Sequence, residues 1–348
     1  MTMYCGRWYE RDERFIAAHH QPALLLDLLL ARDISSHKIL RGSGLFYEDI
    51  LTGSHYLSPA QLQQLITNGR KLLPQEDLSF RWGDSLWPGH YGVFSQLLAN
   101  APDLERALQA LVDYRRFLSP LLVPRIYQDE RYCYVQWLDA CGLQDERRFM
   151  VETAMTGLTA MSRWLAQETL PWRYGFSYAQ PAQDEQYQVY LGPDLHFSVG
   201  VDVMMIEKHW LQKAWPRGSA TAYQVALREA QLLIGEDVAM NGFNEAVYHY
   251  LTQQLRAPQS LPEVAQAFAM SPATFKRKLH KHHCHFQQLQ DQARLHVCLY
   301  LFHINGWTNE QVAHYLNFND TTNFRRAFKR WSGLTPSDSK QRFLFAAG

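Results

Sequence analysis

The sequence predicts an α+β domain followed by an all-α domain that contains two helix-turn-helix units. Three observations support this fold class. Helical and strand-like hydrophobic patterns alternate over residues 1–220. The last third shows helical periodicity only, and one helical unit occurs in it twice. The charge is also divided, because an acidic segment precedes a basic one.

The composition is typical of a soluble globular protein. The chain has 348 residues, of which 47% are hydrophobic and 20% charged, enough for two or three domains. The most apolar run, 24–30, is shorter than the roughly 20 residues of a membrane span and contains Asp27, so we expect no membrane contact. The start lacks the apolar run of a signal peptide. Five scattered cysteines suggest reduced thiols, and we expect a cytoplasmic protein.

Helix and strand signals follow one another along the first part of the chain. An N-cap serine, Ser58, followed by a proline marks a helix over 58–73. Further helices are expected at 22–32, 90–100, 103–118 and 147–170. A hairpin is expected from 125–128 and 131–138, with short strands near 174–178, 187–190 and 203–206. A helical connector over 221–235 leads to Asn241-Gly242, which we interpret as a hinge.

The net charge of zero hides a strong asymmetry. Residues 1–255 carry 22 Lys+Arg and 29 Asp+Glu residues, for a net charge of −7. The last 93 residues carry 12 Lys+Arg and 5 Asp+Glu residues, for a net charge of +7. A basic segment of this kind is typical of nucleic-acid binders, although many solvated surfaces are basic as well.

The basic segment repeats one helical unit, first at 264–279 and again at 312–328. Each copy reads as a helix, a tight turn with a hydrophobic residue, an N-cap and a second helix. Two apolar residues at i,i+4 spacing mark the buried face of that second helix, Phe275 and Leu279 in the first copy and Phe324 and Phe328 in the second. The helix between the copies, expected at 286–305, would hold them apart.

The opposite face of each second helix is expected to face outward. In the first unit this face holds Ala273, Lys276, Arg277 and His280. In the second unit it holds Thr322, Arg325, Arg326 and Lys329. A short helix with one buried face and one basic, hydrogen-bonding face suits the major groove of double-stranded DNA. A solvated basic helix in a bundle is the alternative, but two such helices in duplicate settings favour DNA.

The stretch HKHHCHF, residues 280–286, contains four histidines and a cysteine, which are the usual ligands of zinc. His280 and Cys284 have the i,i+4 spacing that places two ligands on one helix face. The stretch lacks the paired ligand spacings of zinc modules, so we expect a helix end and a corner there and assign no metal. A metal-responsive regulator remains an alternative reading.

The segment NFRRAFKRWSGLTPS, residues 323–337, resembles the C-terminal signature of the AraC/XylS transcription regulators. The resemblance extends back to about Phe243 and covers both helix-turn-helix units. It implies that bases are read from the positions of Ala273, Lys276 and Arg277 in the first unit. In the second unit it implies Thr321, Thr322 and Arg326, and we add Asn323, where the signature begins. Ala269 and Asn317 replace the usual turn glycines, and Ala273 is too short to hydrogen-bond a base.

Residues 89–118 resemble the arabinose-binding-type regulatory domain of one AraC subgroup, and the resemblance covers most of 21–216. It implies a sensor for a small-molecule effector whose identity stays open. Arg115 and Arg116 are candidates for holding an acidic effector, with a solvated helix face as the alternative. Aromatic residues, above all Tyr91 and Trp137, are candidates for lining an apolar pocket, with ordinary core packing as the alternative.

These observations predict a regulatory domain at 1–218, a connector at 219–242 and a DNA-binding domain at 243–348, with helix-turn-helix units at about 261–281 and 308–331. The resemblance favours an activator with RNA polymerase as a partner. The oligomeric state stays open, with a homodimer among the alternatives. The sequence shows no Walker loop, GxGxxG, GxSxG or HExxH motif, so we expect no enzyme and no cofactor. An enzyme fused to a DNA-binding tail is the remaining alternative.

Overall fold

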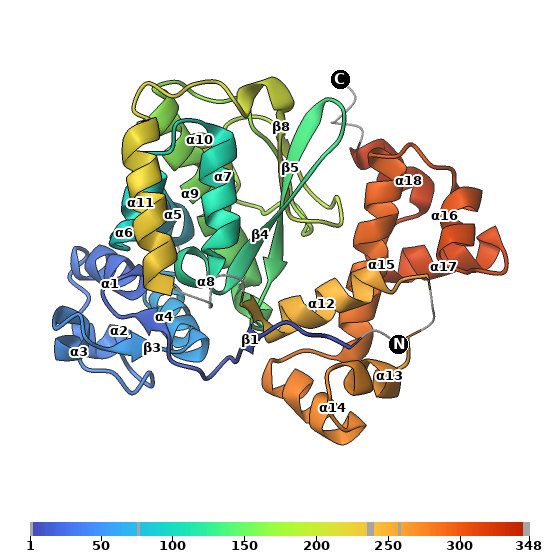
Figure 1. The fold of residues 1–348 in the computed structure, drawn as a ribbon, viewed down its shortest axis with the longest axis horizontal. Helices are drawn as coiled ribbons and strands as arrows, with labels where there is room; N and C mark the ends of the chain where they lie inside the picture. Colours follow the sequence, from blue (N-terminus) through green and yellow to red (C-terminus); the bar gives the residue numbers. More distant parts are fainter. Residues whose placement is uncertain (1–2, 75–76, 235–239, 257–258, 344–348) are drawn as a thin grey trace.

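The computed structural model describes residues 3–74, 77–234, 240–256 and 259–343. The chain forms two lobes, a larger one built from the first two-thirds and a smaller helical one built from the last third (Figure 1). No helix in the described ranges is long and apolar enough to cross a membrane. The two lobes meet along helix α12, Phe243–Gln253, which lies between the central sheet and the remaining C-terminal helices (Figure 1).

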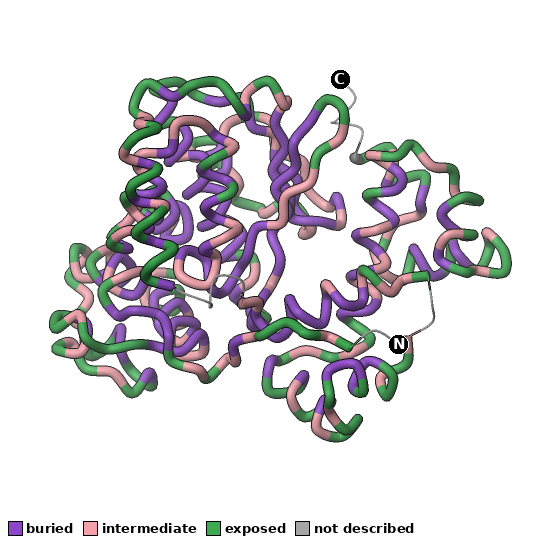
Figure 2. Tube along the Cα trace, viewed as in Figure 1, coloured by how far each residue is buried: buried purple, intermediate pink, exposed green. Residues whose placement is uncertain are grey.

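The larger lobe begins with helices that surround one long buried helix. Helix α9, Arg147–Ala166, is buried along most of its length and forms the centre of the core (Figure 2). The surrounding helices are α1 Gln21–Leu30, α2 Ser36–Ile39, α3 Tyr47–Leu51, α4 Pro59–Leu72, α5 Leu78–Leu86, α6 Val93–Ala99, α7 Leu104–Asp113, α8 Arg115–Leu118, α10 Glu185–Leu191 and α11 Ala220–Ile234. Two short 3-10 helices are η1 Gln144–Glu146 and η2 Lys208–Trp210.

A five-stranded sheet covers one side of this helical core. Its strands, in the order β4-β5-β8-β6-β7, are β4 Leu122–Gln128, β5 Tyr132–Asp139, β8 Val203–Glu207, β6 Arg173–Gly175 and β7 Leu195–His196. All neighbours are antiparallel except β6 and β7, which run parallel. Two small sheets pair β2 Ile16–Ala17 with β3 Tyr56–Leu57, and β1 Trp8–Tyr9 with β9 Asn241–Gly242. This mixture of helices and sheet confirms the predicted α+β class.

The smaller lobe is entirely helical in its described part, as predicted. After α12 come α13 Leu261–Ala267, α14 Pro272–Lys281, α15 Phe286–His303, α16 Asn309–Tyr315, α17 Thr321–Ser332 and α18 Pro336–Phe343. The long helix α15 runs between the pair α13/α14 and the pair α16/α17 (Figure 1). Gly306, just after α15, has a φ of +66°, consistent with the helix end expected at Asn305-Gly306.

Two expectations for the first part need correction. The strand expected at 187–190 is helix α10, because Tyr187 and Leu191 are both buried at i,i+4 spacing on one helix face. The single helix expected over 103–118 is divided at Tyr114 into α7 and the short α8. The connector expected over 221–235 is helix α11, and its last residue, Gly235, lies outside the described residues.

Candidate nucleic-acid interface and domain junction

The first helix-turn-helix unit is formed by α13 and α14. The Ser271 hydroxyl accepts the Thr274 N–H at 3.2 Å and caps α14, whose first residue is Pro272. Phe275 and Leu279 are at most 1% exposed and fix α14 to the core. The side chains expected to contact DNA, namely Ala273, Lys276, Arg277 and His280, are all exposed.

The second unit repeats this geometry in α16 and α17. Thr308 and Gln311 form the expected capping box, and Asp320 accepts the Asn323 N–H at 2.7 Å. Phe324 and Phe328 are fully buried. Of the side chains expected to contact DNA, Thr321 is half-buried, whereas the others are exposed, namely Thr322, Asn323, Arg325, Arg326 and Lys329.

The turns of both units use the left-handed backbone conformation without glycine. Ala269 has a φ of +54° and Asn317 a φ of +57°. Each turn closes with the same backbone bond, from Met270 N to Ala265 O and from Phe318 N to Ala313 O, both at 2.9 Å. The two units that are similar in sequence therefore also have the same backbone geometry in their turns. In the first unit Ala269 occupies a left-handed position that favours glycine.

The substitution Ala269→Gly is expected to raise the free energy of unfolding by about 1 kcal/mol, because glycine adopts this conformation without a Cβ clash. Urea denaturation of the full chain measures the effect. Ala160→Gly is the control, since Ala160 lies inside helix α9 and glycine there is expected to lower stability by about 1 kcal/mol. A loss of stability in both variants would contradict a left-handed residue 269.

The basic residues of α14 divide into two groups. Within the described part of the chain, Lys276 and Arg277 make no ion pair, and both stay exposed. Lys278 and Lys281 instead pair with acidic residues of the N-terminal arm, which we define as residues 3–13. Lys278 contacts the Glu10 carboxylate, and Lys281 pairs with Asp12 at 2.6 Å. One side of α14 is therefore free for a ligand while the other side is held by the first lobe.

The N-terminal arm also packs its aromatic residues on the first unit. The Tyr4 ring stacks on Phe268 with centroids 4.5 Å apart, and Tyr4 N donates to Ala267 O at 2.9 Å. Trp8 contacts Phe268 and Phe243. The only signal of this contact in the sequence is the opposite charge of residues 10–13 and 276–281, which does not by itself predict a contact.

The histidine stretch 280–286 joins α14 to α15. His282 is fully buried, and its Nε2 lies 3.1 Å from a Glu10 carboxylate oxygen. Burial alone would raise the pKa of Glu10, but hydrogen bonds from His282 and Lys278 hold that pKa well below its usual value. His283 occupies the left-handed region at the corner, and His285 is the N-cap of α15. Among the described residues no group of three His, Cys, Asp or Glu side chains is placed to hold a metal ion.

Three of the four candidates for effector contacts have polar partners inside the protein, and the fourth, Trp137, is packed in the core. Arg115 donates to Glu245 at 2.9 Å and also contacts Asn241, so it joins α8 to α12 and β9. Arg116 pairs with Glu13 of the N-terminal arm at 2.9 Å. Tyr91 is buried with its hydroxyl on Leu86 O, and Trp137 is buried beside Trp87. Arg115 therefore lies in the contact between the lobes, and Arg116 is held by the N-terminal arm, so neither arginine lies on a solvated helix face.

Two further contacts make this junction tight. His296 of α15 is buried against Gln136 and Tyr248, whose Nε2 and hydroxyl oxygen lie 2.7 and 2.9 Å from its Nδ1, and burial lowers the pKa of His296 to about 3. Gly142, after β5, lies so close to the turn after α14 that a Cβ atom there would stand 1.9 Å from the His282 carbonyl oxygen. The junction joins β5 to α12 and α15, and it joins the turn after β5 to the turn after α14.

Two family profiles match the chain. The arabinose-binding domain of AraC transcription regulators, N-terminal, matches residues 34–214, and a helix-turn-helix domain matches residues 264–342. The ornithine utilization regulator of Pseudomonas aeruginosa is 24% identical over 322 residues, which cover 91% of this chain and 94% of that protein. The urease operon transcriptional activator of Escherichia coli is 30% identical over 94 residues, covering 27% of this chain and 32% of that protein. The crystal structure of the regulator CdpR from Pseudomonas aeruginosa aligns with 92% of this chain and 98% of its own, at a TM-score of 0.45 and 18% identity.

Proposed function

Since the chain belongs to the AraC transcription regulators that carry an arabinose-binding-type N-terminal domain, we propose that it reads DNA with α14 and α17 under the control of a small-molecule effector. The observation that carries this proposal is the duplicate geometry of the two helices. Each is anchored by a pair of fully buried apolar residues and turns an exposed basic face outward. The proposed boundaries are 1–218 for the sensor, 219–242 for the connector and 243–348 for the DNA-binding domain.

The proposed DNA contacts are Ala273, Lys276, Arg277 and His280 from α14, and Thr321, Thr322, Asn323, Arg325, Arg326 and Lys329 from α17. The second unit supplies the greater share of specificity in this proposal. Ala273 offers only a methyl group, which suits the methyl of thymine, whereas arginine can donate two hydrogen bonds to guanine. Helix α15 would hold the units so that they enter successive major grooves, about 34 Å apart.

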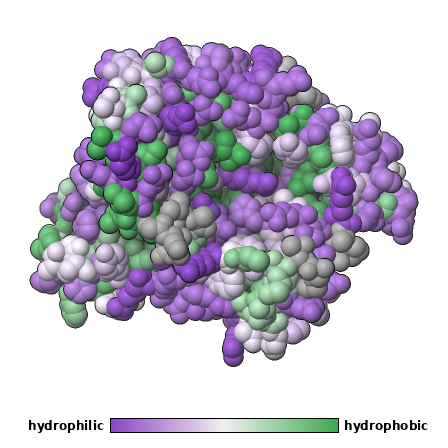
Figure 3. Space-filling view, in the orientation of Figure 1, coloured by the Kyte–Doolittle hydropathy of each residue, from purple (hydrophilic) through white to green (hydrophobic). Residues whose placement is uncertain are grey.

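The remaining partners are also proposals. We infer that the protein works in the cytoplasm, as an activator that contacts RNA polymerase, in line with the relative named as a transcriptional activator. A homodimer is supported by the apolar residues exposed on α11, namely Val225, Leu232 and Leu233. Figure 3 shows hydrophobic surface on the side of the molecule where α11 lies. A relative that covers most of the chain is named for ornithine utilization, which supports a small metabolite as the effector.

The substitution Arg326→Ala tests whether α17 contacts bases. It is expected to weaken binding to the cognate site by about 1–3 kcal/mol, because a bidentate contact with guanine is lost. Binding to random DNA of the same length should change much less. The cognate site is first found by mapping the DNA protected by the protein upstream of its own gene, and affinities are measured by fluorescence anisotropy at one salt concentration.

Arg228→Ala is the matched control, since Arg228 is exposed on α11, away from the proposed DNA-contacting helices. It should leave both affinities unchanged. Equal losses on cognate and random DNA for Arg326→Ala would show that Arg326 contacts phosphate only. Failure of the unsubstituted protein to bind any upstream DNA would reject the proposed function itself.

A further inference from the structure

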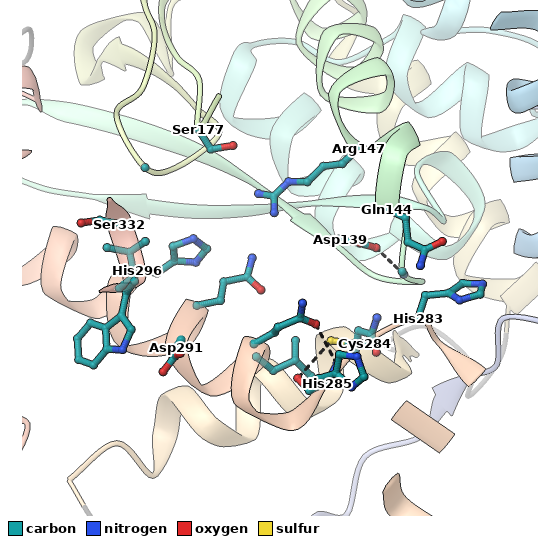
Figure 4. A pocket seen from close by; sticks show the side chains of 18 of the residues that line it. Asp139, Gln144, Arg147, Ser177, His283, Cys284, His285, Asp291, His296 and Ser332 are labelled. Carbon is teal, nitrogen blue, oxygen red and sulfur yellow. Dashed lines mark hydrogen bonds between the residues drawn. The ribbon is translucent and has the colours of Figure 1, made fainter. Parts of the chain in front are cut away.

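A cleft of about 620 Å³ opens between the two lobes, a size typical of small-molecule sites. Its residues come from both lobes (Figure 4). Arg147 and Ser177 line it from the first lobe, and His285, Asp291 and His296 line it from α15. None of the four effector candidates named from the sequence lies on this cleft.

Arg147 provides a site for an anion at the wall of the cleft. Its Nε and Nη2 donate to the same oxygen of Asp202, at 3.1 and 2.6 Å, and Asp202 is fully buried. Nη1 makes no hydrogen bond with the described residues, and the guanidinium group points into the cleft (Figure 4). Asp202 thus fixes the guanidinium while one edge of it stays available to a carboxylate.

The backbone adds positive potential at the same place. Arg147 is the first residue of α9, Asn244 the second of α12, and His285 the N-cap of α15, and all three line the cleft. The N-terminal ends of three helices, each more than ten residues long, therefore meet at the cleft, and helix N-termini favour anions. The aspartate Asp139 on the wall is already satisfied, because it accepts the N–H groups of residues 141, 142 and 143.

Asn244 provides an independent sign that the cleft holds a ligand. It is 2% exposed, and its amide nitrogen donates to His282 O at 3.2 Å. Its Oδ1 is buried and has no hydrogen-bond donor among the described residues. Leaving a buried amide oxygen without a donor costs free energy, so a ligand that brings an ammonium or hydroxyl group to this oxygen is favoured.

Amide and hydroxyl side chains complete the two walls. Gln144 and Ser177 of the first lobe and Gln292 of α15 line the cleft, and none of these three side chains makes a hydrogen bond within the described part of the chain. Amides both donate and accept, so they suit a ligand with mixed polar groups. The polar groups that are available to a ligand therefore come from both sides of the junction.

We propose that this cleft binds a small carboxylic acid that also carries an ammonium or hydroxyl group, with its carboxylate at Arg147 and its donor at Asn244. The proposal rests on the proposed function, because it supplies the effector site of the regulator. Amino acids and hydroxy acids share this chemistry. With these two contacts the ligand bridges the first lobe to α12, which packs against α15, the helix that connects the two DNA-reading units. It therefore binds most tightly to one relative placement of the lobes and shifts the protein toward it.

The test uses the full chain and matched pairs of acids. L-alanine and lactate are compared with propionate, and L-malate with succinate, so that each pair differs in the donor group. The common L-amino acids, tartrate and citrate widen the panel. We expect the midpoint of thermal unfolding to rise with at least one acid that has a donor and to stay unchanged with its donor-free partner. Isothermal titration calorimetry then gives Kd for the acid that stabilises most.

The variants Gln292→Ala and Ser177→Ala remove one polar group from each wall, and each is expected to weaken that Kd about three- to tenfold, the worth of one hydrogen bond. Gln224→Ala, exposed on α11 and outside the cleft, should leave the Kd unchanged. The proposal is overturned if no acid of the panel stabilises the protein, if donor-free acids stabilise it equally, or if both wall variants bind the acid as tightly as the unsubstituted protein.

These failures are separable from failure of the proposed function, because DNA binding is measured in the same preparations. Protein that binds its upstream DNA but none of the acids would retain the proposed function and lose this site. Protein that binds an acid at the cleft but no DNA would retain this site and reject the proposed function.

Discussion

Raising the salt concentration from about 50 to about 200 mM is expected to weaken DNA binding roughly a thousandfold, because about six phosphates would lose their condensed counterions on binding. The cations available to meet them are on the exposed faces of α14 and α17, above all Lys276, Arg277, Arg325 and Lys329. Neutralisation of about six phosphates predicts a slope near −5 in a plot of log K against log salt. Fluorescence anisotropy at several salt concentrations measures it.

Single substitutions measure how much each cation contributes to this salt dependence. Arg325→Ala and Lys329→Ala should each reduce its magnitude by about 1, on random DNA as on the cognate site, because the cationic group of each would meet a phosphate. Arg228→Ala should leave the slope unchanged. A slope close to zero in the unsubstituted protein would contradict the assignment of these faces to DNA.

Glu245→Ala is expected to lower the free energy of unfolding by about 3–5 kcal/mol, because it leaves a buried arginine without its carboxylate. Glu245 is 3% exposed and Arg115 13% exposed in this pair. The Glu245 carboxylate also accepts the Gly242 N–H at 3.0 Å, so the start of α12 loses a cap as well. Urea denaturation followed by circular dichroism measures the loss.

Two controls show whether the loss of stability comes from leaving a buried charge unpaired. Asp84→Ala breaks the pair Arg163–Asp84, whose side chains are about half exposed, and should cost at most about 1 kcal/mol. Replacing both Arg115 and Glu245 by methionine should recover most of the stability, since two apolar side chains leave no unpaired charge. If Glu245→Ala costs no more than Asp84→Ala, the junction is not held by this pair. Arg115 would then again be a candidate for an effector contact.

The local features of the DNA-reading units could be predicted from the sequence because each depends on neighbouring residues. The i,i+4 spacing of Phe275 and Leu279 gives the buried face, and the caps Ser271 and Asp320 give the starts of the helices. The hairpin of β4 and β5 was predictable for the same reason, since only a few residues separate its strands.

The junction could not be predicted, because it is made of contacts between residues far apart in the chain. A two-residue strand such as β1 has no periodicity of its own, and its pairing with β9 is set by packing. The sequence around Arg115 and Arg116 is compatible with a solvated helix face, an effector pocket or a buried ion pair. Only the placement of Glu245 and Glu13 decides between these alternatives. The strand expected at 187–190 was wrong for a different reason: Tyr187 and Val189 alternate as in a strand, whereas Tyr187 and Tyr190 have the spacing of one helix face.

The contact of the N-terminal arm with α14 also sets an order of events during synthesis. Glu10 and His282 are 272 residues apart in the chain, so the ribosome needs on the order of ten to fifty seconds to make the second after the first. During that interval α14 has not been made, and the residues on which Tyr4 and Trp8 pack, Phe243 and Phe268, are missing for most of it. The contact between the arm and α14 therefore forms only late in synthesis, whereas Tyr9 and Arg11 of the same arm bind Pro120 and Cys141, which are made much earlier.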